Sequence, residues 1–283
     1  MTLPNFLGIG APRSGSTWLY NLLRSHPDVY MSQRKEIYFF RNSFHKGLSE
    51  YEKFFPGEEV AQKYVAIGEF TPYYLYCNEC PARIAQVPSI KKFLVILRNP
   101  VDRAFSQFGV LLKAGEFQGT FEDCLAVFWE RLIEHGYYSR PLKEYFRHFD
   151  REQFLILIME EAVNNAAHTK QQLGLFLGLN AAKFADAASK GKINKSYLPR
   201  YPTLSRCLEK SRRQLNRRPY LAWVVTAARN LRIDQLVLAS DKSLPAMKPA
   251  TRHYLEQLYH SEILALESLL GRELSCWRQK RAS

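Results

Sequence analysis

The sequence predicts an α/β protein with three layers, in which a central parallel sheet is flanked by helices. Continuous apolar runs at residues 92–97 and 154–159 have the length and composition of strands buried on both faces. Such runs alternate with helical patterns, as in strand–helix–strand units. The first apolar run, at residues 6–9, leads into a glycine-rich turn and a helix, an order typical of P-loop-like folds.

The length and composition favour a single unit. The chain has 283 residues, 46% of them hydrophobic, which is enough for one large core. No Gly/Ser-rich or Pro-rich linker and no internal repeat divides it. We therefore expect one domain over residues 1–283, with a helical part at about 204–283 packed on it.

The charge balance points to an anionic partner. Forty Lys and Arg residues against 27 Asp and Glu residues give a net charge of +13. Charge alone leaves nucleic acid, an acidic membrane surface, a polyanionic glycan and a nucleotide open. The excess is heaviest at residues 190–232, which fits a solvated helix face as well as a binding patch.

The cysteines and the apolar segments indicate the cellular compartment in which the protein is expected. Five cysteines lack the density of a disulfide scaffold, so a reducing compartment is expected. Cys77 and Cys80 have metal or redox spacing, but no second Cys/His pair follows, so we expect two ordinary thiols and no metal. No segment reads as a signal peptide or a transmembrane span, so a soluble, cytoplasmic protein is expected.

The turn after the first strand is a candidate anion site. Backbone N–H groups of a glycine-rich loop and of the following helix start, together with the helix dipole, attract anions. Gly10 and Gly15 have P-loop spacing, but Ser16 stands where the lysine of that motif belongs. Arg13 instead offers a planar fork suited to phosphate or sulfonate. The alternative is a glycine turn that binds nothing.

Two carboxylates follow predicted strands. Glu36 comes after a short strand at 29–31, and Glu69 after a strand at 64–68. Loops at the carboxyl ends of parallel strands commonly contact ligands, so both are candidate acid/base groups. Lys35 would hold Glu36 ionised or contribute its own charge. The alternative for Lys35 and Glu36 is a surface ion pair.

The strand at 92–97 leads to a second candidate anion site. Arg98 lies at its carboxyl end, and Pro100 suits the start of a helix. Because Ser106 lies two turns along that helix, it and Arg98 could hold one anion from two sides.

The rest of the chain reads mainly as helices. Residues 192–200 form a basic loop of a kind that often acts as a lid. Gly271 is a plausible helix C-cap, and Trp277 is expected to pack the tail onto the body. The expected helices cover residues 121–134, 141–149, 173–179 and 251–270.

With these motifs in place, the chain resembles the sulfotransferase family, and in particular the branch of glycosaminoglycan (heparan sulfate) sulfotransferases and their bacterial relatives. Residues 10–17 are similar to the family's 5′-phosphosulfate loop, and residues 97–106 to its 3′-phosphate motif. Residues 35–40 resemble the segment that supplies the catalytic glutamate of that branch. Further similar segments are residues 136–138, 194–200 and 266–277.

The resemblance implies that the sulfate donor is 3′-phosphoadenosine 5′-phosphosulfate and that the product is adenosine 3′,5′-bisphosphate, without a metal. It implies catalytic roles for Glu36, Lys35 and Arg13. The implied donor-binding residues are Arg13, Ser14, Gly15, Ser16, Thr17, Trp18, Arg98, Ser106, Lys195, Ser196, Tyr197 and Arg200. Glu69, Phe39 and Tyr73 are the expected substrate contacts.

In this chemistry Glu36 takes a proton from an acceptor hydroxyl or amine as the acceptor attacks sulfur in line. A carbohydrate or another hydroxylated metabolite is the expected acceptor, and nucleic acid is not expected.

The sequence departs from the family pattern at three points. Arg13 stands where many heparan sulfate enzymes have lysine, and Phe70 stands where a Glu-Lys-Thr/Ser-Pro element has lysine. The histidine base of the cytosolic aryl and steroid sulfotransferases has no counterpart.

Two other functions stay open. A P-loop kinase or NTPase would need a lysine after Gly15 and an acidic Mg²⁺ ligand. A non-enzymatic polyanion-binding protein would use residues 190–232, and its affinity would fall steeply with salt.

Overall fold

The computed structural model describes residues 2–185 and 244–278, which form two compact units. The described part of the first unit comprises residues 2–100, 137–185 and 259–278, and that of the second comprises 101–136 and 244–258. The expectation of one domain over the whole chain stays a prediction. The basic region at 190–232 lies outside the described residues.

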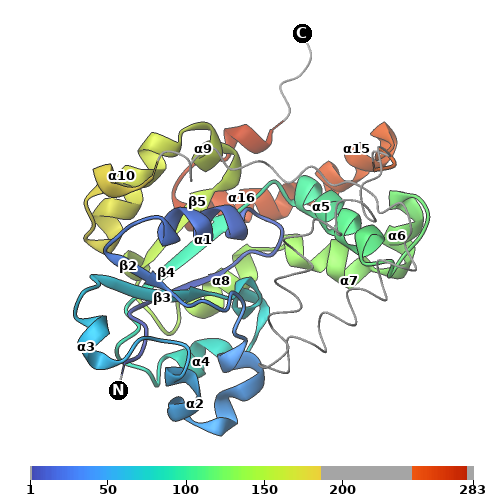
Figure 1. Ribbon diagram of the computed structural model, residues 1–283. Coiled ribbons are helices and arrows are strands. Elements are labelled where there is room, and N and C mark those ends of the chain that lie inside the picture. Colours follow the sequence, from blue (N-terminus) through green and yellow to red (C-terminus); the bar gives the residue numbers. More distant parts are fainter. Residues whose placement is uncertain (1, 186–243, 279–283) are drawn as a thin grey trace, which may run out of the picture. The chain divides into compact units, whose positions relative to one another are not determined.

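A five-stranded parallel sheet forms the centre of the first unit, as the sequence predicts (Figure 1). The strand order is β2-β3-β1-β4-β5, and every neighbouring pair is parallel. Because β1 lies in the middle, the glycine-rich loop that follows it stands at the centre of the carboxyl edge. The strands are β1 (Phe6–Gly10), β2 (Val29–Met31), β3 (Ala66–Phe70), β4 (Lys92–Leu97) and β5 (Phe154–Ile158).

The apolar runs are continuous because both faces of the sheet are covered. In β4, Val95 and Leu97 belong to the core on one face, and Leu94 and Ile96 to the core on the other. The second of these cores contains α1 (Ser16–Arg24), α9 (Met159–Asn164) and α10 (Ala166–Leu177). The first contains α2 (Leu48–Glu52), α4 (Cys80–Ile84), α8 (Ser139–Tyr145) and α16 (His260–Leu270).

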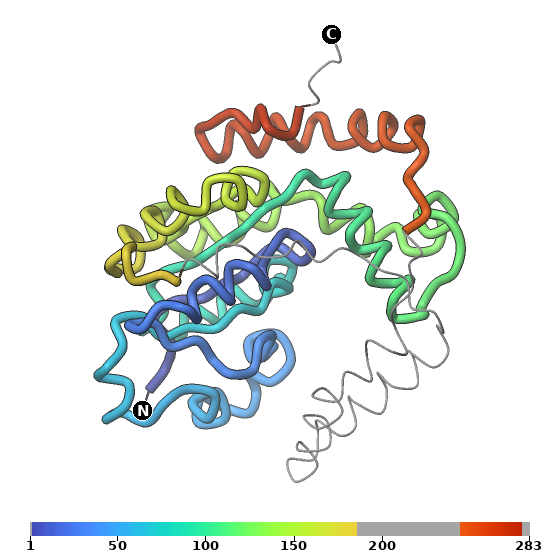
Figure 2. The backbone as a smooth tube through the Cα atoms, turned by 45° about the horizontal axis from the view of Figure 1, so that its top comes forward, coloured from blue at the N-terminus to red at the C-terminus, as the bar shows by residue number. Residues whose placement is uncertain are grey.

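The three layers follow from these two cores. Helices α1 and α10 cover one face of the sheet, and Figure 2 shows them side by side. Helices α4 and α8 cover the other face. The remaining elements of the first unit are short: α3 (Glu58–Ala61), η1 (Phe39–Ser43), η2 (Phe44–Lys46), η3 (Pro72–Tyr76), η5 (Arg151–Gln153), η6 (Ala181–Lys183) and η8 (Ser275–Trp277).

The second unit packs around aromatic rings. Phe121 lies 5.5 Å from Phe105 and 5.6 Å from Phe108 between ring centroids. Arg103 is fully buried there and donates to the carbonyl oxygen of Leu132. The elements are α5 (Pro100–Lys113), α6 (Phe121–Val127), α7 (Trp129–Leu132), η4 (Glu134–Gly136) and α15 (Pro249–Leu258).

Several helix boundaries differ from the prediction. The helix expected at 121–134 is broken at Phe128, whose φ of −121° and ψ of 37° are not helical and whose ring packs on Phe117. The helix expected at 251–270 divides at Tyr259, a fully buried residue whose ring packs on Tyr137. The helix expected at 141–149 is α8, which both begins and ends earlier, at Ser139 and Tyr145. The helix expected at 173–179 is the last part of α10, which begins at Ala166 and ends at Leu177.

The predictions for Gly271 and Trp277 are confirmed. Gly271 caps α16 with a φ of 65°, a conformation that favours glycine. Trp277 is only 5% exposed and belongs to the core that contains α16.

The expectation of two thiols at Cys77 and Cys80 was wrong. The structure joins them in a disulfide at the junction of η3 and α4. A turn in which the amide of Cys80 donates to the carbonyl of Cys77 over 3.1 Å brings their Cα atoms to 5.3 Å, within disulfide range. Of the other described cysteines, Cys124 and Cys276 are free.

Candidate active site

The loop after β1 leads into α1 through a residue whose conformation favours glycine. Gly15 has a φ of 92°, and a Cβ added there would lie 3.2 Å from Cγ of Met159. In the described structure, no side chain caps α1 and its first turn holds no acidic residue. The N–H groups of that turn can therefore be satisfied by an anionic ligand.

Two polar side-chain atoms at this loop support the same interpretation. Ser14 is fully buried, and its Oγ has no hydrogen-bond partner among the described residues. The indole Nε1 of Trp18 is likewise buried without a described partner. Because buried donors are nearly always paired, a ligand that accepts hydrogen bonds fits this loop.

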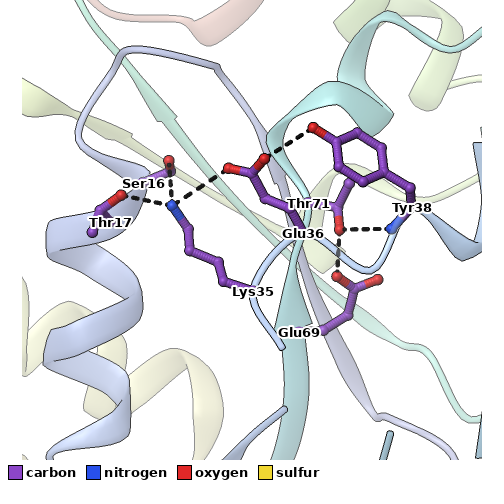
Figure 3. A network of polar contacts seen from close by, with 7 residues as sticks. All are labelled: Ser16, Thr17, Lys35, Glu36, Tyr38, Glu69 and Thr71. Carbon is purple, nitrogen blue, oxygen red and sulfur yellow. Dashed lines mark hydrogen bonds and ion pairs between the residues drawn. The ribbon is translucent and has the colours of Figure 1, made fainter. Parts of the chain in front are cut away.

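Lys35 supplies a positive charge at the start of α1. Its Nζ donates to Oγ1 of Thr17 over 2.7 Å and to Oγ of Ser16 over 3.4 Å (Figure 3). The charge that a P-loop motif takes from the lysine after its second glycine thus comes from another segment of the chain. Burial lowers the pKa of Lys35; nearby Glu36 raises it, and the charge of Arg13 lowers it further.

Glu36 is held on both carboxylate oxygens. Its Oε1 lies 3.6 Å from Nζ of Lys35, and its Oε2 accepts a 2.9 Å hydrogen bond from the hydroxyl of Tyr38 (Figure 3). Its backbone has a φ of 63°, and its amide donates to the carbonyl of Phe70 over 3.1 Å. Because its side chain is 36% exposed, a substrate can still approach it.

Sequence reasoning missed Tyr38. Its amide donates to Oγ1 of Thr71 over 3.4 Å, and its own φ is 60°. Burial, and then the charge of Glu36, raise the pKa of Tyr38, so its hydroxyl stays protonated and acts as a donor. The only local signal was its position two residues after Glu36.

Glu69 is fully buried, which corrects its expected role as a substrate contact. Strand β3 extends to Phe70 because Glu69 pairs with Leu7 and Phe70 with Gly8, so Glu69 lies within the strand and not after it. Its Oε2 accepts a 2.6 Å hydrogen bond from Thr71 and its Oε1 a 3.2 Å bond from Tyr51. Burial raises the pKa of Glu69 to about 7, with these hydrogen bonds opposing the shift.

The aromatic residues near Glu36 divide into buried and accessible ones. Phe39, an expected substrate contact, is fully buried and stacks on Tyr51 at 4.3 Å, so its ring faces the core. Tyr73 is half-buried, 6.2 Å from the ring of Tyr38, and the guanidinium of Arg41 lies 5.9 Å from its centroid. Of the three expected substrate contacts, Tyr73 is therefore the one whose side chain is partly exposed.

Arg98 connects the two predicted anion-binding segments. Its Nη1 donates to the carbonyl oxygen of Arg13 over 3.4 Å. Ser106 lies on α5 in the second unit, so its pairing with Arg98 stays a prediction. The other predicted donor contacts, Lys195, Ser196, Tyr197 and Arg200, lie outside the described residues.

Residues 2–185 and 244–278 contain no group of three or more His, Cys, Asp or Glu side chains that could hold a metal ion. None of the helices there combines the length and the apolar composition needed to cross a bilayer.

The fold is that of a P-loop-like α/β protein, and Lys35, Glu36 and Arg98 lie around its glycine-rich loop and the start of α1. The chain belongs to the sulfotransferase family, because the sulfotransferase domain matches residues 3–220. A crystal structure of a sulfotransferase from Alicyclobacillus acidocaldarius has the same fold, with 23% identity, a TM-score of 0.65, and coverage of 99% of this chain and 100% of that one.

Two of the curated relatives that the chain resembles are named for heparan sulfate. Heparan sulfate glucosamine 3-O-sulfotransferase 3B1 of Mus musculus is 32% identical over 186 residues, covering 62% of this chain and 46% of the relative. The bifunctional heparan sulfate N-deacetylase/N-sulfotransferase 4 of Mus musculus is 27% identical over 204 residues, 62% of this chain and 22% of the relative. The chain thus spans less than half the length of these relatives.

Proposed function

We propose that this protein transfers a sulfuryl group from 3′-phosphoadenosine 5′-phosphosulfate to a hydroxyl or amine of an acceptor. Family membership supports the reaction class. The observation that carries the proposal is the placement of Lys35 and Glu36: the lysine contacts the start of α1, and the carboxylate next to it is partly exposed. A donor-side cation and an acceptor-side base thus stand side by side.

On the donor side, the residues act by neutralising charge. The uncapped first turn of α1, Arg13 and Lys35 suit the charge that develops on the 5′-phosphate as its bond to sulfur breaks. The hydroxyls of Ser16 and Thr17, which Lys35 contacts, suit the same group. The buried Oγ of Ser14, which has no partner among the described residues, fits this ligand as well.

On the acceptor side, Glu36 acts as general base. It takes the proton of the acceptor O–H or N–H bond while the acceptor oxygen or nitrogen forms its bond to sulfur. The leaving group is adenosine 3′,5′-bisphosphate. Because the heparan sulfate relatives are named for a glycan, we propose a carbohydrate acceptor for this chain, with Tyr73 beside it.

Calorimetry with adenosine 3′,5′-bisphosphate tests the donor site. We expect binding by the wild type and a loss of at least about tenfold in Arg98→Ala, since a charge-assisted contact is removed. Arg147→Ala, which breaks the exposed pair with Glu144, is the matched control and should bind like the wild type. Absence of binding, or equal binding by Arg98→Ala, would overturn the proposal.

The acceptor is then found by transfer from labelled donor to a panel of glycans, amino sugars and small hydroxylated metabolites. A carbohydrate should be labelled. If only the other compounds are labelled, the proposed sulfuryl transfer is supported but the proposal of a carbohydrate acceptor is wrong.

A further inference from the structure

One peptide unit at the end of β4 is fixed at both of its polar ends. The carbonyl oxygen of Arg98 accepts a 2.8 Å hydrogen bond from the hydroxyl of Tyr138. The N–H of Asn99, in the same peptide unit, donates to Oε1 of Glu160 over 2.9 Å. Tyr138 is fully buried, so the first of these bonds is shielded from water.

The C-terminal segment completes this arrangement. Trp277 donates from Nε1 to Oε2 of Glu160 over 3.0 Å, and its carbonyl oxygen accepts from Nδ2 of Asn99 over 3.2 Å. Its ring lies 6.1 Å from the ring of Tyr138. Figure 1 shows the segment that holds Trp277 beside α9, which holds Glu160. Residues distant in sequence thus enclose the peptide after Arg98.

The orientation of this peptide constrains the backbone of Arg98, and therefore the direction in which its side chain leaves the backbone. An arginine side chain loses considerable conformational entropy when its guanidinium binds a ligand. A fixed backbone reduces this loss, because the unbound side chain then has fewer orientations. The guanidinium already reaches the carbonyl of Arg13 at the first loop. The held peptide therefore aims Arg98 toward the anion-binding end of the sheet.

We propose that Tyr138, Glu160 and Trp277 are positioning residues that aim Arg98 at the 3′-phosphate of the donor nucleotide. This inference rests on the proposed function, in which Arg98 contacts that phosphate. None of the three residues need touch the nucleotide. Their contribution should therefore be seen only with a nucleotide that carries a 3′-phosphate.

The test compares two nucleotides that differ by this one group, adenosine 3′,5′-bisphosphate and adenosine 5′-monophosphate, by calorimetry. Trp277→Phe keeps an aromatic ring but removes the donor to Glu160, and Tyr138→Phe removes the donor to Arg98. Each should weaken the bisphosphate about three- to tenfold, the effect of about one net hydrogen bond. Binding of the monophosphate should stay within about twofold.

The control variant is Arg272→Ala, which breaks an exposed ion pair with Glu161 in the same part of the chain. It should leave both affinities unchanged. In an Arg98→Ala background, Trp277→Phe should have no further effect on the bisphosphate, because the group that it positions is gone.

Two kinds of outcome are distinguishable. If the wild type binds neither nucleotide, the proposed function is wrong. If the wild type binds the bisphosphate and loses it in Arg98→Ala, but the two Phe variants bind it unchanged or lose both nucleotides equally, the positioning role is wrong. Should one variant fail to fold by circular dichroism, the other decides the question.

Discussion

The hydroxyl of Tyr38 donates a 2.9 Å hydrogen bond to Oε2 of Glu36, while Lys35 approaches Oε1 (Figure 3). The carboxylate is thus held from two sides in one orientation. The backbone is left-handed at both Glu36 and Tyr38, with φ values of 63° and 60°. A base held in this way is already oriented before the acceptor binds.

Tyr38→Phe should lower kcat by about tenfold, because a hydrogen bond to a charged carboxylate is lost. The affinity for adenosine 3′,5′-bisphosphate should stay unchanged, since in the described structure the Tyr38 side chain hydrogen-bonds to Glu36 and packs on Tyr73, and neither of these lies in the loop after β1. Steady-state kinetics with the acceptor from the screen, together with calorimetry, would measure both quantities. Tyr64→Phe, which removes a hydroxyl outside the site, is the control. A loss of nucleotide affinity would contradict the assigned role.

Glu36→Gln should abolish proton transfer but preserve the shape of the site. We expect transfer from labelled donor to fall by about two orders of magnitude or more, with nucleotide affinity retained. Glu50→Gln, at an exposed pair with Lys53, is the control. If Glu36→Gln keeps its turnover, the base lies elsewhere, and Glu69 is a poor candidate because it is fully buried.

Gly15→Ala should disrupt the loop through its backbone. A φ of 92° costs a residue with a Cβ about 1–2 kcal/mol, and the new atom would press on Met159. We expect a lower Tm and at least about tenfold weaker binding of adenosine 3′,5′-bisphosphate. Gly57→Ala is the control, since a Cβ there meets nothing within 4 Å and its φ is −60°. Normal binding by Gly15→Ala would show that the loop does not need this conformation.

Glu69 should make stability depend on pH. The folded protein holds this proton up to about pH 7, whereas an unperturbed carboxyl releases it near its usual value of 4.5. The contribution of Glu69 to the free energy of unfolding therefore falls as pH rises from about 4.5 to 7, by up to about 3 kcal/mol.

Glu69→Gln cannot titrate, so its stability should fall less over this range than that of the wild type. Urea unfolding of both proteins at pH 5 and pH 8 measures the difference. Parallel pH dependence would mean that Glu69 does not release its proton in this window.

The sheet and the glycine turn after β1 could be predicted because their signals are local. A continuous apolar run such as residues 92–97 is typical of a parallel strand that is covered on both faces. Gly15 indicates a turn by its residue type alone. Lys35 and Glu36 could be singled out for the same reason, since they lie in the loop that follows β2.

The environment of Glu36 could not be predicted, because it depends on segments far apart in sequence. Glu69 is buried because β3 pairs with β1 as far as Phe70, which the residues of β3 alone do not indicate. The contact of Tyr38 with Thr71 joins two loops across 33 positions. The helix breaks at Phe128 and Tyr259 likewise follow from tertiary packing, which overrides local helix propensity.

Phe70 stands where the family pattern has a lysine, and the structure shows what this exchange requires. Its ring is fully buried over Gly8 of β1, where an added Cβ would meet the ring at 2.2 Å. The two positions therefore share one volume, and neither can change alone without steric conflict or a void. A lysine in place of Phe70 would leave the space over Gly8 unfilled unless the residue at position 8 were enlarged together with it.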